Sequence, residues 1–305
     1  MAANSKIEWT HSTFNPHWGC ARVSPGCEHC YAETFAHRLG LKVWGANADR
    51  REFGDKHWTE PLKWDKAAAK AGERHRVFCA SMADVFEDHP VAQRSRDRLW
   101  PLIKSTPNLD WLLLTKRPEN IARMLPADWG TGYANVWLGT TVEDRKRKGR
   151  IDELRAVPAA IHFLSLEPLL EDPDLGDDDL AGIDWVIVGG ESGHGARRFD
   201  VTWARSIISQ CRAAGVAVHV KQLGAFVVDR NDAFDTCSVP PEDDSQWPWH
   251  DRDPDDIEDN INGFREEYQG APVRVHLRDK KGGDWNEWPA DLRVREYPIV
   301  REVCQ

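Results

Sequence analysis

Short apolar runs recur along the first 225 residues, and stretches with helical periodicity separate them. Six runs have the length of strands: 77–81, 111–115, 136–141, 161–165, 185–189 and 216–220. Continuous apolar runs that alternate with helices are typical of buried parallel strands in βαβ units. The segments 91–104 and 201–214 look amphipathic, as helices between such strands should. The pattern therefore predicts an α/β protein built around a parallel sheet.

The number of units favours a barrel over an open sheet. A seventh strand is predicted near 7–10, and six or seven units would form a partial or complete parallel (β/α) barrel. The rhythm ends at residue 225, because residues 225–283 are acidic, rich in Pro and Trp, and only weakly periodic. We therefore predict two domains: a barrel over 1–224, and an irregular acidic insertion and C-terminal extension over 225–305 that packs on the barrel.

Polar residues follow the end of every predicted strand. The carboxyl ends of parallel barrel strands lie on one face, so these residues are predicted to share a site. The candidates for that site are Ser81, Asp84, Lys116, Arg117, Thr141, Glu143, Glu167, Gly189, Gly190, Glu191, Ser192, His194, Lys221 and Gln222.

The charge distribution changes this picture only locally. The chain of 305 residues has a net charge of −10, which argues against a generally basic nucleic-acid-binding protein. Residues 242–259 hold nine acids against one arginine, so the rest of the chain is nearly neutral. The basic stretch 145–150 and the group Arg94, Arg96 and Arg98 are either solvated helix faces or phosphate contacts. The fifteen Trp residues either pack in the core or offer stacking surfaces for bases.

No apolar run has the length of a membrane span, and the N-terminus has no signal-peptide core. We therefore predict a cytoplasmic protein without a membrane partner. A reducing compartment keeps cysteines as thiols, so clustered cysteines indicate a metal or redox site and not a disulfide framework.

Three of the seven cysteines, Cys20, Cys27 and Cys30, share one short loop that is rich in Gly and Pro. Structural zinc sites close with four ligands, whereas cubane iron–sulfur clusters are held by cysteine thiolates. Three thiolates would leave one iron of a cubane open to a small molecule. Two alternatives remain: a zinc site completed by His17, His29 or Cys79, and thiols that only pack in the core.

The cysteine loop and the strand-end motifs together resemble the radical S-adenosylmethionine (SAM) superfamily, and in detail its phage-associated three-Cys-motif family. The matching segments are 15–20, 24–32, 81–86, 114–118, 138–143, 164–169, 188–193, 220–224 and 284–289. Two details depart from the superfamily pattern. Six residues separate Cys20 from Cys27 where three are usual, and the Gly-Gly-Glu run at 189–191 follows a later strand than usual.

The resemblance implies a radical-SAM-like barrel in which Cys20, Cys27 and Cys30 hold a [4Fe–4S] cluster that binds SAM. It implies that SAM contacts come from a set of strand-end residues: His29, Ser81, Asp84, Lys116, Thr141, Glu143, Glu167, Gly189, Gly190 and Glu191. Arg117, Ser192, His194, Lys221 and Gln222 are then candidates for the substrate site. The glycines at 189 and 190 could instead let the backbone approach a phosphate or a substrate.

The implied function is a radical SAM enzyme that modifies or repairs a nucleic acid or nucleoside. It would take electrons from a reductase or a flavodoxin-type donor. The alternatives are a non-catalytic iron–sulfur protein that binds nucleic acid, and a zinc-dependent hydrolase.

Overall fold

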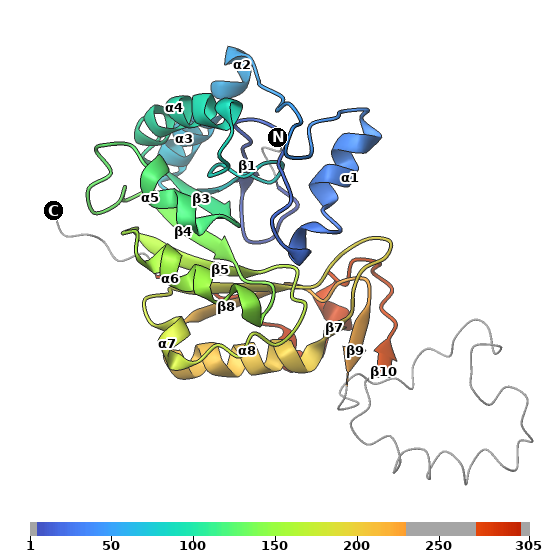
Figure 1. The fold of residues 1–305 in the computed structure, drawn as a ribbon. Helices are drawn as coiled ribbons and strands as arrows, with labels where there is room; N and C mark the ends of the chain where they lie inside the picture. The colour runs from blue at the N-terminus through green and yellow to red at the C-terminus, as the bar shows by residue number, and fades with distance from the viewer. Residues whose placement is uncertain (1–4, 230–272, 300–305) are drawn as a thin grey trace, which may run out of the picture.

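The computed structural model describes residues 5–229 and 273–299. Seven parallel strands form one sheet in the order β1-β2-β3-β4-β5-β6-β8 in this part of the chain. Their bounds are β1 Ser12–Thr13, β2 His75–Cys79, β3 Leu109–Thr115, β4 Val136–Thr141, β5 Ile161–Leu166, β6 Trp185–Gly189 and β8 Ala217–Gln222. The sheet curls into a half-barrel with helices on its outer face (Figure 1). This confirms the predicted fold class and the six apolar runs.

The helices that follow the strands cover one face of the sheet. They are α3 Glu60–Ala71, α4 Pro90–Lys104, α5 Ile121–Met124, α6 Gly149–Arg155, α7 Asp177–Leu180 and α8 Val201–Ala214. In α8 the buried side chains Val201, Ala204, Ile207, Ile208 and Cys211 recur at helical spacing. Asp200 caps its first turn and Gly215 ends it in the left-handed conformation, at φ 70°. Local sequence therefore determines both ends of this helix.

Alternation along the strands separates an outer core from an inner one. Outward-facing residues such as Val77 and Leu113 pack with the helices. Inward-facing residues form a second cluster without helices: Trp9, Phe78, Leu112, Trp137, Ile161, Phe163, Trp185 and Ile187. We call this second cluster the aromatic floor.

The seventh strand is not where the sequence predicted it. Residues 7–10 form a turn closed by a hydrogen bond from the Thr10 amide to the Ile7 carbonyl, and the strand is Ser12–Thr13 instead. Trp9 explains the difference, since its ring packs 4.7 Å from Phe78 and 6.1 Å from Trp185 in the floor. The apolar positions at 7–10 that resembled a strand instead belong to a turn that buries Trp9 in the barrel interior.

A small second sheet has the order β10-β9-β7, with β7 Phe199–Asp200, β9 Val227–Asp229 and β10 Val273–Val275. The later described tail packs against the barrel, where Trp288 is 2% exposed and the Val218 and Glu296 backbones are hydrogen-bonded. The division at residue 225 stays a prediction. The acidic stretch 242–259 lies outside the described residues.

Candidate functional site

The cysteine loop, residues 19–30, lies between β1 and helix α1 (Tyr31–Arg38) at the carboxyl ends of the strands. The Gly19 amide donates to the Met82 carbonyl at 3.0 Å, and the Asn15 side chain accepts from the Met82 amide at 2.7 Å. Gly19 has φ 114°, and a Cβ there would lie 2.2 Å from the Val43 carbonyl oxygen, so only glycine fits. We call this end of the half-barrel the mouth.

On its buried side the loop is held by Arg117. One guanidinium nitrogen lies 3.5 Å from the Cys20 sulfur and 2.9 Å from Asp84 Oδ2, and the other donates to the Ala21 carbonyl at 2.7 Å. Arg117 is only 7% exposed, so its charge depends on the Asp84 carboxylate. This arrangement places a fixed positive charge directly against Cys20.

Glu87 holds the same side of the loop. Its carboxylate accepts from the Ala21 amide at 2.9 Å and forms two 2.8 Å hydrogen bonds with Arg50. Arg50 itself is 5% exposed and donates to the Val43 and Ala48 carbonyls. The buried side of the loop is therefore fixed by charged hydrogen bonds that reach its backbone at Ala21.

On its outer side the loop is held by Arg197. This side chain donates to the Pro25 carbonyl at 2.9 Å, pairs with Glu28 at 3.2 Å and forms several hydrogen bonds with Glu191. His29 Nδ1 lies 3.4 Å from Glu191. Burial raises the pKa of the Glu191 carboxyl, but the hydrogen bonds and charge of Arg197 outweigh burial, and the net pKa is lowered.

The inner face of the barrel becomes polar at the mouth, directly above the aromatic floor. Glu167 forms a 2.6 Å ion pair with Lys221 across β6. Gly189 lies between them, and a Cβ on it would be 2.8 Å from Glu167 Oε1, so the glycine makes room for the pair. Lys116 Nζ donates to Thr141 Oγ1 at 3.2 Å.

Glu143 lies beneath the cysteine loop and is fully buried. Arg150 pairs with one of its oxygens at 2.8 Å, and the Ser24 side chain of the cysteine loop also interacts with the carboxylate. A Cβ on Gly26 would lie 3.1 Å from this carboxylate. Burial raises the pKa of Glu143, but Lys116 and Arg150 outweigh it and the net pKa is lowered, so the group stays ionised.

The three thiols have the burial expected of metal-binding side chains, neither enclosed nor free in solvent. Burial raises the pKa of the Cys20 thiol to about 12, against the opposing charge of Arg117, and burial also raises the pKa of Cys30. Bound iron would reverse this preference, because coordination takes the thiolate form. A short loop with three thiols, one of them beside a fixed cation, fits a cluster that binds a different iron through each sulfur.

No group of three His, Cys, Asp or Glu side chains, the three loop cysteines included, converges on a single ion position within residues 5–229 and 273–299. Cys79, a candidate ligand of the zinc alternative, is buried in the outer core. His17 is fully buried, and burial lowers its pKa to about 4.

Several predicted site residues have structural partners instead of facing the mouth. Asp84 accepts from Thr115, Phe86 and Arg117, and Gln222 donates to the Gly190 carbonyl. A Cβ on Gly190 would lie 2.2 Å from the Leu223 carbonyl, so close backbone packing accounts for this glycine.

The remaining predicted residues lie at the rim of the mouth. Ser81 exchanges side-chain hydrogen bonds with Asn15, and its carbonyl accepts from Tyr31. Ser192 is half-buried and His194 is exposed.

The two basic stretches are mostly neutralised within the chain. Arg147 pairs with Asp144, Lys148 with Asp179 and Arg150 with Glu143, which leaves Arg145 and Lys146 as exposed cations without an ion pair among the described residues. In the other group Arg94 pairs with Glu52, Arg98 pairs with Asp55, and Arg96 is 2% exposed. Among the described tryptophans, Trp285 is the one that counts as an exposed apolar side chain. Of the two readings left open by the sequence, internal ion pairs and core packing therefore account for most of these residues.

Sequence reasoning missed Arg197 and Arg50, and it counted Glu87 among the polar residues after the first strand without giving it a role. Each acts on the loop over a long separation in the chain, 172 residues for Arg197 and the Pro25 carbonyl. No local motif marks these residues.

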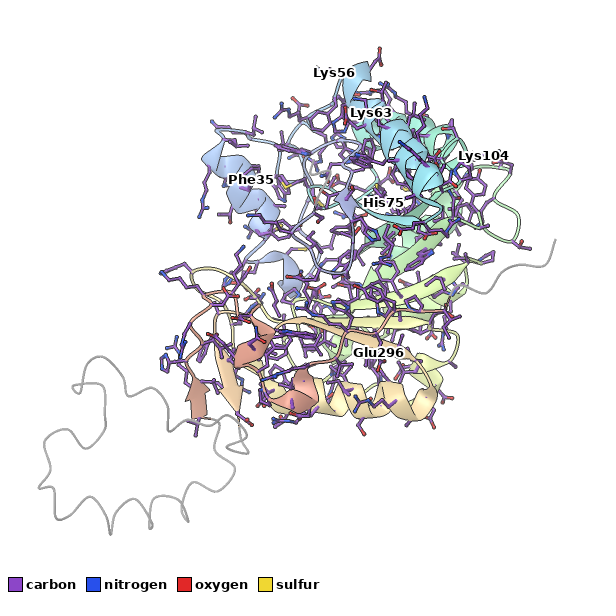
Figure 2. All side chains as sticks on the ribbon, turned by 180° about the vertical axis from the view of Figure 1, so that it is seen from behind. Phe35, Lys56, Lys63, His75, Lys104 and Glu296 are labelled. Atoms are coloured by element: carbon purple, nitrogen blue, oxygen red, sulfur yellow. The ribbon has the colours of Figure 1, made fainter. Side chains whose placement is uncertain are left out.

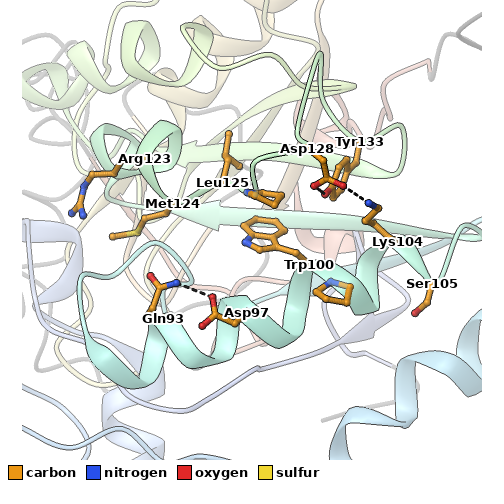
Figure 3. A pocket seen from close by; sticks show the side chains of 12 residues that line it. Gln93, Asp97, Trp100, Lys104, Ser105, Arg123, Met124, Leu125, Asp128 and Tyr133 are labelled. Atoms are coloured by element: carbon orange, nitrogen blue, oxygen red, sulfur yellow. Dashed lines mark hydrogen bonds and ion pairs between the residues drawn. The ribbon is translucent and has the colours of Figure 1, made fainter.

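A pocket of about 750 Å³ lies away from the mouth, between α4 and the segment 123–133 (Figure 3). Trp100 and Tyr133 line it, and the Lys104–Asp128 ion pair crosses one side. None of its lining residues belongs to the predicted site, so this pocket plays no part in the site at the mouth.

Fold and site together define a parallel half-barrel protein with a cysteine loop at its mouth. The chain belongs to the family described as "Protein of unknown function (DUF5131)", whose model matches residues 4–288. A comparison with curated proteins found no match. No helix among the described residues has the length and apolar character to cross a membrane.

Among solved structures, the chain is similar to spore photoproduct lyase. One neighbour is a double mutant with bound AdoMet and dinucleoside spore photoproduct; it is 13% identical, with a TM-score of 0.46, and the match covers 87% of this chain and 76% of that one. A second, complexed with the dinucleoside spore photoproduct, is 13% identical with a TM-score of 0.38 and the same coverage. TM-scores this low say nothing about the activity of this chain.

Proposed function

We propose that this protein is a radical SAM enzyme of the phage-associated three-Cys-motif family. One observation carries the proposal: a loop with three half-buried cysteines lies at the carboxyl-end mouth of a parallel half-barrel. The mouth presents ionised and polar side chains to the loop, whereas the barrel below it is closed by aromatic rings. A site of this kind can hold a polar cofactor and exclude water beneath it.

In this proposal Cys20, Cys27 and Cys30 hold a [4Fe–4S] cluster, and SAM binds against the mouth. The bound pair supplies reductive cleavage of SAM to methionine and a 5′-deoxyadenosyl radical. Glu167 and Glu143 offer carboxylates to the cationic parts of SAM, and Lys116 and Lys221 offer charge to its carboxylate. Glu191 can serve from the rim, where Arg197 keeps it ionised and beside His29.

The test begins with anaerobic purification and analysis of bound iron and sulfide. We expect about four of each per chain, and release of 5′-deoxyadenosine from SAM after reduction with dithionite. Cys27→Ala should lose both the cluster and SAM cleavage. Cys211→Ala is the matched control, because Cys211 is buried in α8 and should leave iron content unchanged.

Other outcomes separate the alternatives. A protein that binds iron and sulfide but never cleaves SAM would be a non-catalytic iron–sulfur protein. Stoichiometric zinc that supports activity would contradict the proposal directly.

For the substrate we propose a nucleic acid or a nucleoside, as the target of base modification or lesion repair. The support is the family resemblance together with Lys116 at the mouth, a cation that donates to Thr141 and is in no ion pair among the described residues. Affinity for an oligonucleotide should fall with salt, because phosphate contacts release counterions. Lys146→Ala should reduce the salt slope slightly, while Lys66→Ala, on an exposed face of α3, should not. Filter binding at low salt without any retention would leave a free nucleoside or another class of substrate.

A further inference from the structure

Exposed apolar side chains of this protein are concentrated beside the cysteine loop. Nine large hydrophobic side chains are exposed in the described part of the chain, and four of them lie between residues 23 and 39. They are Val23, Tyr31, Phe35 and Leu39, with exposures of 44%, 57%, 45% and 52%. Concentrated exposed apolar side chains with polar neighbours mark interaction sites more often than scattered ones do.

Three of the four form a stripe along helix α1. Tyr31, Phe35 and Leu39 are spaced by four residues, so they lie on one face of the helix. The side chains of Ala32 and Ala36, at the next position around the helix, are buried, and Leu39 is the C-cap residue. Figure 1 shows α1 on the side of the molecule away from α3 and α4, with α8 below the sheet, and Figure 2 shows Phe35 on this peripheral helix. The Tyr31 hydroxyl donates to the Ser81 carbonyl and the Phe35 ring has an edge contact with Trp18, so Phe35 and Leu39, each about half exposed, carry the exposed part of the stripe.

The stripe starts next to a proposed cluster ligand. Cys30 is the N-cap residue of α1 and Tyr31 is the first helical residue. Eight helical residues at about 1.5 Å each give the stripe a length of about 12 Å from that ligand. A molecule docked on this face would therefore lie beside the cluster without entering the mouth.

The charge around the stripe is positive although the protein is acidic overall. The two acids of residues 21–42 are both paired, Glu28 with Arg197 and Glu33 with Arg22. Arg38 and Lys42 are exposed and have no ion-pair partner among the described residues. An acidic partner is thus favoured here and disfavoured by much of the remaining surface.

We propose that Val23, Phe35, Leu39, Arg38 and Lys42 form the docking surface for a small acidic redox protein of the flavodoxin class. The inference rests on the proposed function. One electron passes per encounter: the reduced donor flavin loses one electron and the cluster gains one, with no bond made or broken. A few apolar side chains with cations around them fit the small, transient interfaces of electron-transfer partners.

The experiment compares two reductants of the reconstituted protein. Cluster reduction is followed anaerobically by absorbance and electron paramagnetic resonance, with reduced flavodoxin or with dithionite, which needs no docking surface. The double variant Phe35→Ser/Leu39→Ser should slow reduction by flavodoxin at least about tenfold, as loss of central apolar contacts does. Its rate with dithionite should stay within about twofold of the parent, since ordinary surface substitutions perturb the fold little.

Charge is tested separately from apolar contact. The double variant Arg38→Glu/Lys42→Glu should lower the rate at which reduced flavodoxin reduces the cluster. It should also remove the dependence of this rate on ionic strength. The matched control is Lys66→Glu/Lys70→Glu, two exposed lysines four residues apart on α3, which should change neither rate. Leu62→Ser, 36% exposed on the same helix, is the apolar control.

Each outcome decides the matter. Unchanged flavodoxin rates in both double variants would overturn the docking surface, as would equal slowing with both reductants, which would indicate a structural role for α1. Lost oligonucleotide affinity with normal flavodoxin rates would assign the stripe to nucleic acid instead. If the parent protein holds no cluster, or does not cleave SAM with dithionite, the proposed function itself has failed. The docking surface alone has failed if the parent passes both tests and the variants are reduced by flavodoxin at the parent rate.

Discussion

The two halves of the barrel's inner face differ sharply, although the same strands build both. Toward the amino ends, aromatic rings fill the space, and Trp185 contacts the rings of Trp9, Trp137 and Phe163. Toward the carboxyl ends, ionised and hydroxyl side chains replace them, and the buried Ser165 Oγ lacks a hydrogen-bond partner among the described residues. Side-chain packing fills the aromatic half of the inner face, whereas the polar half at the mouth has the groups to bind a polar ligand.

Removing a ring from the floor should have the largest effect on stability. Trp185 is fully buried and makes several edge-to-face ring contacts. Trp185→Ala should lower the free energy of unfolding by about 3–5 kcal/mol, because the cavity cannot collapse among rigid rings. Urea unfolding measures this, and a loss below about 1 kcal/mol would mean that the floor does not stabilise the barrel.

A methyl group added at the boundary between the two halves should have a smaller effect on stability and should also weaken SAM binding. Gly189→Ala would place Cβ 2.8 Å from Glu167 Oε1 and displace the Glu167–Lys221 pair. We expect a loss of about 1–3 kcal/mol in unfolding free energy, together with weaker SAM binding in calorimetry. Gly176→Ala, where a Cβ meets nothing within 4 Å, is the control. Normal SAM affinity in Gly189→Ala would remove Glu167 from the proposed site.

These two positions also show what the sequence can and cannot reveal. The apolar runs predicted the strands to within two residues, because burial on both faces produces a local pattern. The same pattern did not show that Trp9 packs in the aromatic floor, because a buried aromatic residue gives the same local pattern in a strand and in a turn. It also did not show why residues 189 and 190 are glycines, because Glu167 and Leu223 approach them from distant parts of the chain. The network of Arg50, Glu87 and Arg197 was missed for the same reason.

Stability below neutral pH should depend on a histidine at the floor. Burial lowers the pKa of His219 to about 3, and Arg295, Lys221 and Arg76 add to this. The unfolded chain, with an ordinary pKa of 6.5, then binds a proton that the folded chain does not. The contribution of His219 is complete above pH 6.5 and falls by about 1.4 kcal/mol per pH unit as the pH drops below it.

His219→Leu should remove that part of the slope and cost little at pH 7, because neither ring nitrogen has a hydrogen-bond partner among the described residues. Urea midpoints at pH 7 and pH 5.5 give the comparison. An unchanged slope would mean that another group dominates the acid sensitivity.

The smallest effect is expected at the mouth. Ser165→Ala removes a buried hydroxyl without a hydrogen-bond partner among the described residues and should change unfolding free energy by less than about 1 kcal/mol. The free energy of SAM binding should weaken by more than the free energy of unfolding does. Equal SAM affinity in parent and variant would place Ser165 outside the binding surface.

The fastening of the cysteine loop by Arg117, Glu87 and Arg197 has a practical consequence. Zinc fingers and similar small domains fold only when their metal arrives, so losing the metal means losing the fold. Here the side chains that fasten the loop bind its backbone at Ala21 and Pro25, so these contacts do not run through the three thiols. If the proposed cluster is bound there, its loss to oxygen should therefore leave the chain folded, resistant to proteolysis and able to accept a new cluster.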